Sequence, residues 1–149
     1  AIGNDGELRP ISLVANDQPN IGERILSRET ASTVKLMMEE VVKPGGTGSE
    51  ASVAGYRIAG KTGTSWKFAP GGYSEDKYFS IFAGLAPASD PRVAAVVVID
   101  EPTGSLYYGG DVAAPLFGNV MSESLRLLAV PPDGTALVKA DETIQAMSQ

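Results

Sequence analysis

Apolar residues recur at helical spacing between residues 28 and 42, which predicts an amphipathic helix. Ser27 is a good N-cap for this helix, and Glu29 suits the positive end of its dipole. The helix is expected to end before Pro44, because a proline followed by two glycines does not continue it. We expect its two methionines to pack in the core rather than to bind a ligand. The apolar positions are Ala31, Val34, Met37, Met38, Val41 and Val42.

A second helix is predicted between residues 113 and 128, where apolar residues again recur at helical spacing. The pair Pro131-Pro132 follows it and ends the pattern. The residues expected on its apolar side are Leu116, Val120, Leu125 and Leu128.

Strands are predicted where β-branched and aromatic residues run between turn residues. Residues 78–86 and 92–100 form two such runs, and the short turn between them favours antiparallel pairing. Residues 53–65 also look extended, and residues 10–14 form a plausible short strand. Two helices and three to four antiparallel strands predict an α+β fold, with an antiparallel sheet flanked by helices.

The composition is that of one globular domain of 149 residues, 43% hydrophobic and 20% charged. A net charge of −6 argues against a general electrostatic attraction to nucleic acid or to anionic membranes. The chain has no cysteine and no histidine, which excludes disulfides, thiol nucleophiles, common zinc sites and Ser-His-Asp triads. No apolar run approaches the roughly 20 residues of a membrane-spanning helix. We therefore expect any export signal or membrane anchor to lie outside this chain.

Residues 55–62 match the nucleotide-binding P-loop pattern G-x-x-x-x-G-K-[ST]. Asp100 follows a hydrophobic run, as the metal-binding acid of a P-loop enzyme does. A P-loop, however, opens a helix whose N-terminal amides hold the phosphates. Residues 63–72 contain further glycines and a proline and lack helical periodicity. We therefore reject the nucleotide-binding hypothesis and expect Lys61 to lie on a strand.

The KTGT run at residues 61–64 has a second interpretation, because penicillin-binding proteins and serine β-lactamases carry a K-T-G element. On a strand, Thr62 and Thr64 project to the same side and offer two hydroxyls to one carboxylate. Gly63 has no side chain, so an extended peptide can lie against the strand edge. Lys61 adds positive charge without any histidine. The run therefore predicts a binding site for a peptide carboxylate.

Three longer stretches resemble a known family. They read LSRETASTVKLMMEEVVKPGGTGSEASVAGYRIAGKTGTS, YFSIFAGLAPASDPRVAAVVVIDEP and YYGGDVAAPLFGNVM. Together they resemble the C-terminal half of the transpeptidase domain of class B penicillin-binding proteins, most like the division-specific penicillin-binding protein 3 group of Gram-negative bacteria. Residues 1–132 are accordingly expected to be the C-terminal portion of that domain. Residues 133–149 are expected to be a polar, mobile tail.

The resemblance implies a serine-type D,D-transpeptidase that crosslinks peptidoglycan stem peptides at the septum and is acylated by β-lactams. By position, Lys61 is similar to the family's motif lysine, which forms hydrogen bonds with the polar network of the active site and helps to attract the substrate carboxylate. Thr62 and Thr64 correspond to the hydroxyl donors, and the backbone N–H of Thr64 corresponds to one of two oxyanion-hole donors. Gly63 belongs to the same substrate-binding strand. The resemblance implies neither a metal nor a cofactor.

Three tyrosines, Tyr78, Tyr107 and Tyr108, match positions that form an aromatic wall beside the cleft in similar enzymes and contact bound inhibitors. Ordinary strand and loop packing is the alternative role for each of them. Trp66 departs from the family, whose members often carry Ala-Arg or Ala-Lys after the motif. The chemistry of the cleft rim is therefore expected to differ in this chain.

The nucleophile of the family is missing from its expected place. The family needs S-x-x-K, whose serine attacks and whose lysine activates it, together with S-x-N. Ser32 and Lys35 match S-x-x-K, but the chain has no S-x-N, and only 25 residues lie between Lys35 and Lys61. That spacing leaves no room for the helical subdomain of the fold. We therefore interpret Ser32 and Lys35 as polar helix positions and expect the chain alone to be inactive.

The expected partners are the N-terminal half of the same domain, peptidoglycan stem peptides, β-lactam antibiotics and division proteins, without nucleic acid. The expected location is the periplasmic face of the inner membrane, with an anchor outside this chain. Two alternatives stay open. One is a serine β-lactamase-like hydrolase, and the other is a non-catalytic module that binds a peptide carboxylate.

Overall fold

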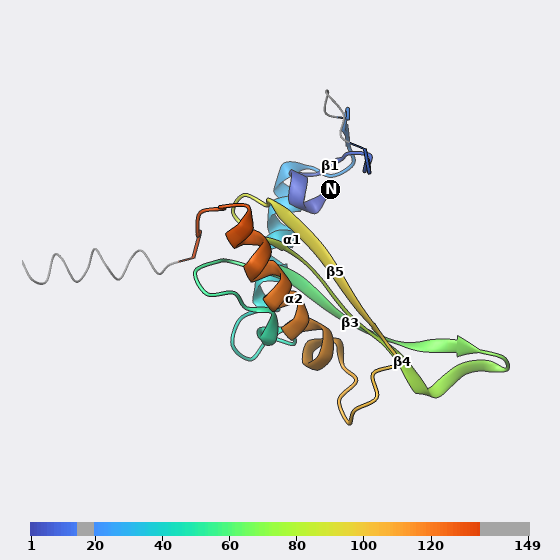
Figure 1. The fold of residues 1–149 in the computed structure, drawn as a ribbon. Helices are drawn as coiled ribbons and strands as arrows, with labels where there is room; N and C mark the ends of the chain where they lie inside the picture. The colour runs from blue at the N-terminus through green and yellow to red at the C-terminus, as the bar shows by residue number, and fades with distance from the viewer. Residues whose placement is uncertain (15–19, 135–149) are drawn as a thin grey trace, which may run out of the picture.

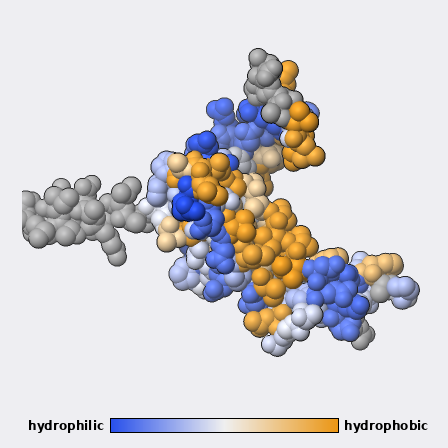
Figure 2. Space-filling model, viewed as in Figure 1, coloured by the Kyte–Doolittle hydropathy of each residue, from blue (hydrophilic) through white to orange (hydrophobic). Residues whose placement is uncertain are grey.

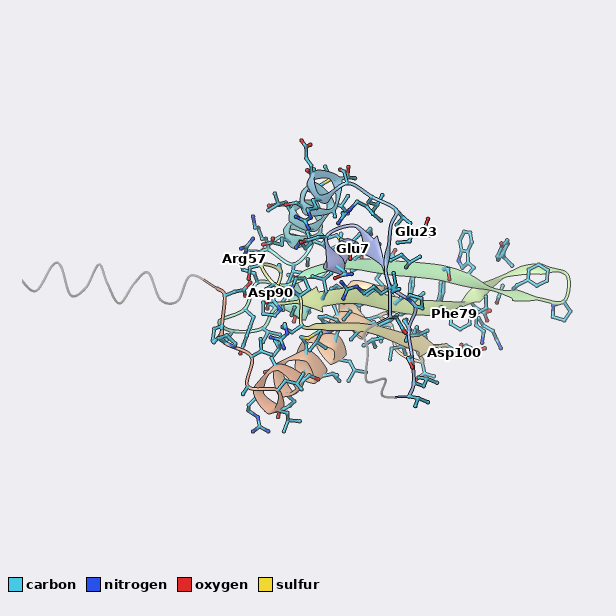
Figure 3. All side chains as sticks on the ribbon, turned by 90° about the horizontal axis from the view of Figure 1, so that it is seen from above. Glu7, Glu23, Arg57, Phe79, Asp90 and Asp100 are labelled. Carbon is cyan, nitrogen blue, oxygen red and sulfur yellow. The ribbon has the colours of Figure 1, made fainter. Side chains whose placement is uncertain are left out.

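The computed structural model describes residues 1–14 and 20–134 of the chain (Figure 1). A three-stranded antiparallel sheet forms its centre, with helix α1 on one face and helix α2 on the other (Figure 3). The fold is therefore α+β, as the sequence predicts. In chain order the elements are η1 (Ile2–Asn4), β1 (Glu7–Leu8), β2 (Glu23–Arg24), α1 (Arg28–Glu40), η2 (Ser49–Ala51), β3 (Ala59–Ala69), β4 (Gly72–Ala86), β5 (Val93–Asp100) and α2 (Gly109–Leu127).

The sheet has the order β3-β4-β5, and both neighbouring pairs are antiparallel. Thr62 lies opposite Phe82, which lies opposite Val97 on the other side. A short turn joins β4 to β5, which confirms the predicted antiparallel hairpin. The hairpin of β3 and β4 continues beyond the end of β5 and projects from the body of the molecule (Figure 1).

Two hydrophobic clusters hold the helices against the sheet. Since side chains alternate along a strand, neighbouring positions serve opposite faces. On one face Phe82 packs against Phe117 of α2, with ring centroids 4.7 Å apart. On the other face a smaller cluster lies between the sheet and α1. That cluster consists of Ala59, Leu85 and Ala88, with Met38 packed against it.

Both predicted helices are present, with shifted ends. The hydroxyl of Ser27 accepts a hydrogen bond from the backbone N–H of Thr30 at 3.0 Å, which confirms the predicted N-cap. Helix α1 ends at Glu40, two residues before the predicted end. Helix α2 begins at Gly109, four residues before the predicted start, because its first glycines pack against the sheet instead of forming a turn.

The buried sides of both helices differ from the prediction. Met37 is 64% exposed, whereas Met38 is partly buried, so only one of the two methionines packs in the core. In α2, Leu116 and Val120 are exposed although they were expected on the apolar side. Small residues let α2 approach the sheet closely. A prediction based only on the spacing of large apolar residues therefore misplaces the buried side of this helix. The buried side of α2 includes Ala113, Ala114, Phe117, Met121 and Leu125, while Leu128 is exposed.

The strand predicted at residues 10–14 is wrong. Pro10 has no N–H to donate to a neighbouring strand. The side chains of Ile11 and Leu13 are 94% and 101% exposed, so no sheet face covers them. The short strands of this region are instead β1 and β2, which pair with each other.

The strand predicted at residues 53–65 is displaced along the chain. Residues 53–58 form a turn around Gly55, whose φ is +81°, and β3 begins at Ala59. Strands β3 and β4 also extend further into the hairpin than predicted. The glycines and the proline that the pattern treats as breakers form the hairpin turn, where Gly71 has a φ of +102°.

The segment after α2 is tied to the body of the molecule. The hydroxyl of Tyr56 donates to the carbonyl of Val130 at 2.6 Å. The carboxylate of Asp133 accepts hydrogen bonds from the backbone N–H of Arg57 at 2.7 Å and of Ser89 at 3.1 Å. The rest of the predicted tail, residues 135–149, lies outside the described residues. Among the helices that are described, none is both long and apolar enough to cross a bilayer.

Candidate functional site

The KTGT run lies on β3, at an edge of the sheet. The strand continues to Ala69 and turns directly into β4, so no helix follows Lys61 and Thr62. A P-loop needs that helix, because its N-terminal amides bind the phosphates. The strand geometry therefore excludes the P-loop arrangement and confirms that Lys61 lies on a strand.

Two threonine hydroxyls lie side by side on the face of β3 that carries α2. The Oγ1 atom of Thr62 is 3.1 Å from Oγ1 of Thr47, within hydrogen-bond distance. The Oγ1 atom of Thr64 accepts a hydrogen bond from the backbone N–H of Gly109 at 3.0 Å. Because Thr64 uses a lone pair in that contact, its O–H proton is left to donate to a ligand.

The beginning of α2 packs directly on this part of β3. A Cβ atom at Gly109 would collide with the backbone carbonyls of Ile81 and Gly63, and one at Gly110 would collide with the carbonyl of Thr47. Only glycine lets the helix come this close. The positive end of the α2 dipole therefore lies beside the Thr64 hydroxyl, which favours an anion there.

Lys61 is exposed on the opposite face of the strand, and its Nζ atom donates to the carbonyl of Thr62 at 2.9 Å. That contact puts the Thr62 carbonyl on the outer edge of β3, away from β4. Backbone groups alternate along a strand, so the N–H and carbonyl of Thr64 point to the same outer edge. The edge thus offers two hydroxyls, an ammonium group and a backbone N–H.

Three tyrosines form a stacked row beside the threonines. Tyr78 of β4 stacks on Tyr107, with ring centroids 4.3 Å apart and an interplanar angle of 17°. Tyr107 in turn lies against Tyr108 at 4.5 Å, and its hydroxyl donates to that of Tyr108 at 3.2 Å. This hydrogen bond raises the pKa of Tyr107 above its ordinary value of 10.0. The hydroxyl of Ser80 donates to the Tyr107 carbonyl and holds the loop in place.

A cavity of about 440 Å³ opens between the tyrosines and β3. The structure brings the three predicted tyrosines together with Thr64 in this cavity, and it adds Trp66 and Tyr73, which had no assigned role. Gly109, Gly110 and Thr47 were also missed, although the Gly-Gly pair opening a helix is a visible signal of close packing. The cavity lining consists of Thr64, Ser65, Trp66, Tyr73, Tyr78, Tyr107 and Tyr108.

Ser32 and Lys35 do not form a catalytic pair in this structure. Ser32 is exposed on α1, whereas Lys35 is buried, with its Nζ atom 3.9 Å from a carboxylate oxygen of Asp5. The ammonium group of Lys35 is therefore directed toward Asp5, and the exposed Ser32 hydroxyl lies elsewhere on the helix surface. In the part of the chain that the structure describes, no group of three or more acidic side chains is placed to hold a metal ion.

Comparisons with known proteins agree with this geometry. The family model for the penicillin binding protein transpeptidase domain matches residues 1–122. The chain is 46% identical over 148 residues to "Peptidoglycan D,D-transpeptidase FtsI" of Escherichia coli (strain K12). That alignment covers 99% of this chain and 25% of the Escherichia coli protein. It is 43% identical over 132 residues to "Probable peptidoglycan D,D-transpeptidase PenA" of Neisseria meningitidis (strain MC58), covering 89% of the chain and 23% of that protein.

A solved structure shares the fold. It is the apo structure of the TP domain from Burkholderia pseudomallei penicillin-binding protein 3, with a TM-score of 0.80 and 44% sequence identity. The similarity covers 89% of this chain and 41% of that chain. The chain therefore spans about a quarter of the length of the curated relatives named above. On these grounds the chain belongs to the penicillin-binding protein transpeptidase family.

Proposed function

We propose that this chain is the C-terminal part of a peptidoglycan D,D-transpeptidase that crosslinks stem peptides during septal wall synthesis and is a target of β-lactams. The observation that carries the proposal is the outer edge of β3. There, Lys61, Thr62 and Thr64 present an ammonium group and two hydroxyls on an edge strand of the sheet. This set of groups suits the terminal carboxylate of an extended peptide.

In the proposed binding step, a stem peptide adds to β3 as an antiparallel strand. Its terminal carboxylate accepts hydrogen bonds from the hydroxyls of Thr62 and Thr64, and Lys61 adds positive charge. The backbone N–H of Thr64 donates to the carbonyl oxygen that becomes negative when a serine attacks. Such a preorganised donor contributes about 3 kcal/mol to the stabilisation of an oxyanion.

The nucleophilic serine is proposed to come from the N-terminal half of the same domain. Strand β5 supports this, because it is apolar on both faces although it lies at an edge of the sheet. Val96 and Val98 are 66% and 52% exposed on the face away from α2. Strands with two apolar faces are normally buried inside a sheet, and long apolar edges are normally paired.

A second uncovered apolar surface supports the same conclusion. Leu116 and Val120 lie exposed one helical turn apart on α2, at the margin of its buried side. Figure 2 shows apolar surface that extends from α2 over the neighbouring strand β5. A partner that covers both faces of the sheet and pairs with β5 completes one core. The proposed N-terminal half is therefore part of the same domain and not a separate binding module.

The proposed location is the periplasmic face of the inner membrane, with an anchor outside this chain, and the proposed partners include division proteins. The names of the relatives support a role in the peptidoglycan layer, where the substrate is found. The expected location follows from the substrate and from the similarity, and can be tested by fractionating cells that express the complete protein.

Labelling with a fluorescent penicillin tests the proposed function. We expect the complete protein to be labelled on a serine outside this sequence, and the 149-residue chain alone to stay unlabelled. The complete protein with Ser32→Ala should be labelled like the wild type. A label on Ser32 would contradict the assignment, and an unlabelled complete protein would favour the non-catalytic carboxylate-binding module. Rapid loss of the label by hydrolysis would favour the β-lactamase-like hydrolase.

A further inference from the structure

The side chain of Thr47 reaches the carboxylate-binding edge from outside β3. Its Oγ1 atom lies 3.1 Å from Oγ1 of Thr62, although the two residues are 15 positions apart in the chain. Thr47 belongs to the loop that joins α1 to η2. The proposed binding step uses Thr62 and leaves this contact with Thr47 unexplained.

Close packing fixes the backbone on both sides of Thr47. A Cβ atom at Gly46 would collide with the carbonyl of Val41, and one at Gly48 would come within 2.6 Å of the Phe82 ring. The backbone N–H of Gly48 also donates to the Val41 carbonyl at 2.9 Å, which ties the loop to the end of α1. Thr47 therefore lies between two glycines whose places no larger residue fits, and its backbone is held without any ligand.

The start of α2 packs against the same residue. A Cβ atom at Gly110 would collide with the Thr47 carbonyl and would lie 3.6 Å from the methyl group of Thr62. The neighbouring Gly109 donates its N–H to the hydroxyl of Thr64 at 3.0 Å. One helix start thus locates Thr47 through its backbone and Thr64 through a hydrogen bond. Each threonine of the strand edge therefore has a hydrogen-bond partner that comes from another part of the fold.

The partners of the two strand threonines differ in the direction of their hydrogen bonds. A backbone N–H can only donate, so Thr64 accepts from Gly109 and keeps its own proton for another acceptor. Between Thr47 and Thr62, either hydroxyl can donate to the other. A carboxylate bound beside Thr64 decides this direction, because a carboxylate only accepts. Thr62 lies on the same strand face as Thr64, so it donates to the carboxylate and accepts from Thr47.

In that arrangement the hydroxyl of Thr47 acts on the anion through the hydroxyl of Thr62. Hydrogen bonds in a chain polarise one another, so a proton donated by Thr47 strengthens the bond from Thr62 to the carboxylate. It also selects one rotational state of the Thr62 hydroxyl before the ligand arrives, which lowers the entropy cost of binding.

We propose that Thr47 is a positioning residue of the carboxylate-binding edge, which donates its hydroxyl proton to Thr62 and so directs the Thr62 proton toward the ligand. This inference rests on the proposed function, because it takes the ligand carboxylate to lie at Thr62 and Thr64. It goes further by extending the site to the loop between α1 and η2, outside the KTGT run.

Acylation of the complete protein by benzylpenicillin and by its methyl ester tests this role. The two compounds differ only at the carboxylate, which is an uncharged group in the ester. Thr47→Val keeps the shape of the side chain and removes its hydroxyl. We expect it to lower the ratio of the acylation rate constants for acid and ester about fivefold, the effect of one hydrogen bond. Thr47→Ser should restore the ratio, and Ser49→Ala, on the same loop, is the matched control that should leave it unchanged.

A double-mutant cycle separates action through Thr62 from direct contact with the ligand. In a Thr62→Val background, Thr47→Val should not change the ratio further, because the hydroxyl through which it acts is missing. A second fivefold loss in that background would mean that Thr47 contacts the carboxylate itself, and would overturn the proposed role. An equal loss for acid and ester in Thr47→Val alone would leave it a packing role only, and an unchanged ratio would refute the proposal.

A second measurement does not require acylation. NMR signals of threonine methyl groups in the complete protein can follow the binding of N-acetyl-D-alanyl-D-alanine, with its C-terminal amide as the uncharged comparison. We expect Thr47→Val to raise the Kd of the acid about fivefold and to leave that of the amide unchanged.

The two measurements distinguish failure of the proposed function from failure of this inference. If benzylpenicillin does not acylate the protein while the Kd of the acid responds to Thr47→Val as expected, the acyl-transfer function fails and the role of Thr47 stands. If the Kd of the acid is the same in Thr47→Val as in the wild type, the role of Thr47 is refuted. If the wild type binds neither the acid nor the amide, the carboxylate site is refuted and the role of Thr47 with it.

Discussion

A single methyl group at Gly109 tests whether the contact between α2 and β3 organises the site. Gly109 is buried as the first residue of the helix, and its N–H donates to the hydroxyl of Thr64 at 3.0 Å. In Gly109→Ala the new Cβ atom would meet the carbonyls of Ile81 and Gly63, which belong to the backbone of the sheet. Backbone atoms cannot rotate away, so the helix has to move.

The expected cost is set by opposing contributions. Overpacking a buried position costs about 1–3 kcal/mol, and loss of the hydrogen bond to Thr64 costs about 1 kcal/mol. Alanine is the better helix former by about 1 kcal/mol, which offsets part of the loss. We expect Gly109→Ala to lower the free energy of unfolding by about 1–3 kcal/mol, although the same change in an unobstructed helix is stabilising.

Two measurements on the complete protein follow this change. Denaturant titration gives the loss of stability, and the rate of acylation by penicillin reports on the position of Thr64. Because small misplacements of positioning groups slow chemistry strongly, we expect acylation to slow by about tenfold or more. Gly118→Ala is the matched control on the same helix, since its Cβ would lie 3.2 Å from the Glu50 carbonyl oxygen and away from the site. It should cost at most about 1 kcal/mol and leave acylation unchanged.

The reasoning would be refuted if Gly109→Ala were as stable as the wild type and were acylated at the same rate. That result would mean that α2 can retreat from β3 without disturbing Thr64. A loss of stability with normal acylation would separate the packing role of Gly109 from any effect on the site.

Three further predictions concern other contacts. Asp133→Asn should lower the free energy of unfolding by about 2 kcal/mol in denaturant titrations, because an amide nitrogen cannot accept the bonds made by one carboxylate oxygen, while Ser89→Ala should cost about 1 kcal/mol. The hydrogen bond from Lys67 lowers the pKa of Glu101 below 4.5, so its stabilisation is present above that pH and is lost as the pH falls through the folded pKa. Protection factors for hydrogen exchange at residues 66–68, which are corrected for the intrinsic pH dependence of exchange, should therefore fall in acid, and Lys67→Met should abolish that fall. Ala129→Gly should raise the melting temperature, corresponding to about 0.5–1 kcal/mol, because Ala129 has a φ of +49° after α2; an unchanged or lower value would contradict this.

Local patterns were sufficient for much of the fold. The turn after β4 and the β-branched run of β5 predicted the second hairpin, because hairpin pairing is decided by neighbouring residues. Ser27 predicted the start of α1 for the same reason. The sequence pattern did not predict the full length of the hairpin of β3 and β4, because its glycines were interpreted as breaks. In the structure the two strands stay paired at these glycines.

The sequence by itself determined that Lys61, Thr62 and Thr64 lie on a strand, because no helix can begin at the glycines and proline that follow. It also determined that the three tyrosines are candidates for one site, through a resemblance to a known family. Only the tertiary structure decided that Gly109 packs on Thr64 and that Trp66 joins the tyrosines in one cavity. These contacts join residues far apart in the chain, and their geometry depends on how α2 and the hairpin pack against the sheet, which no local pattern encodes.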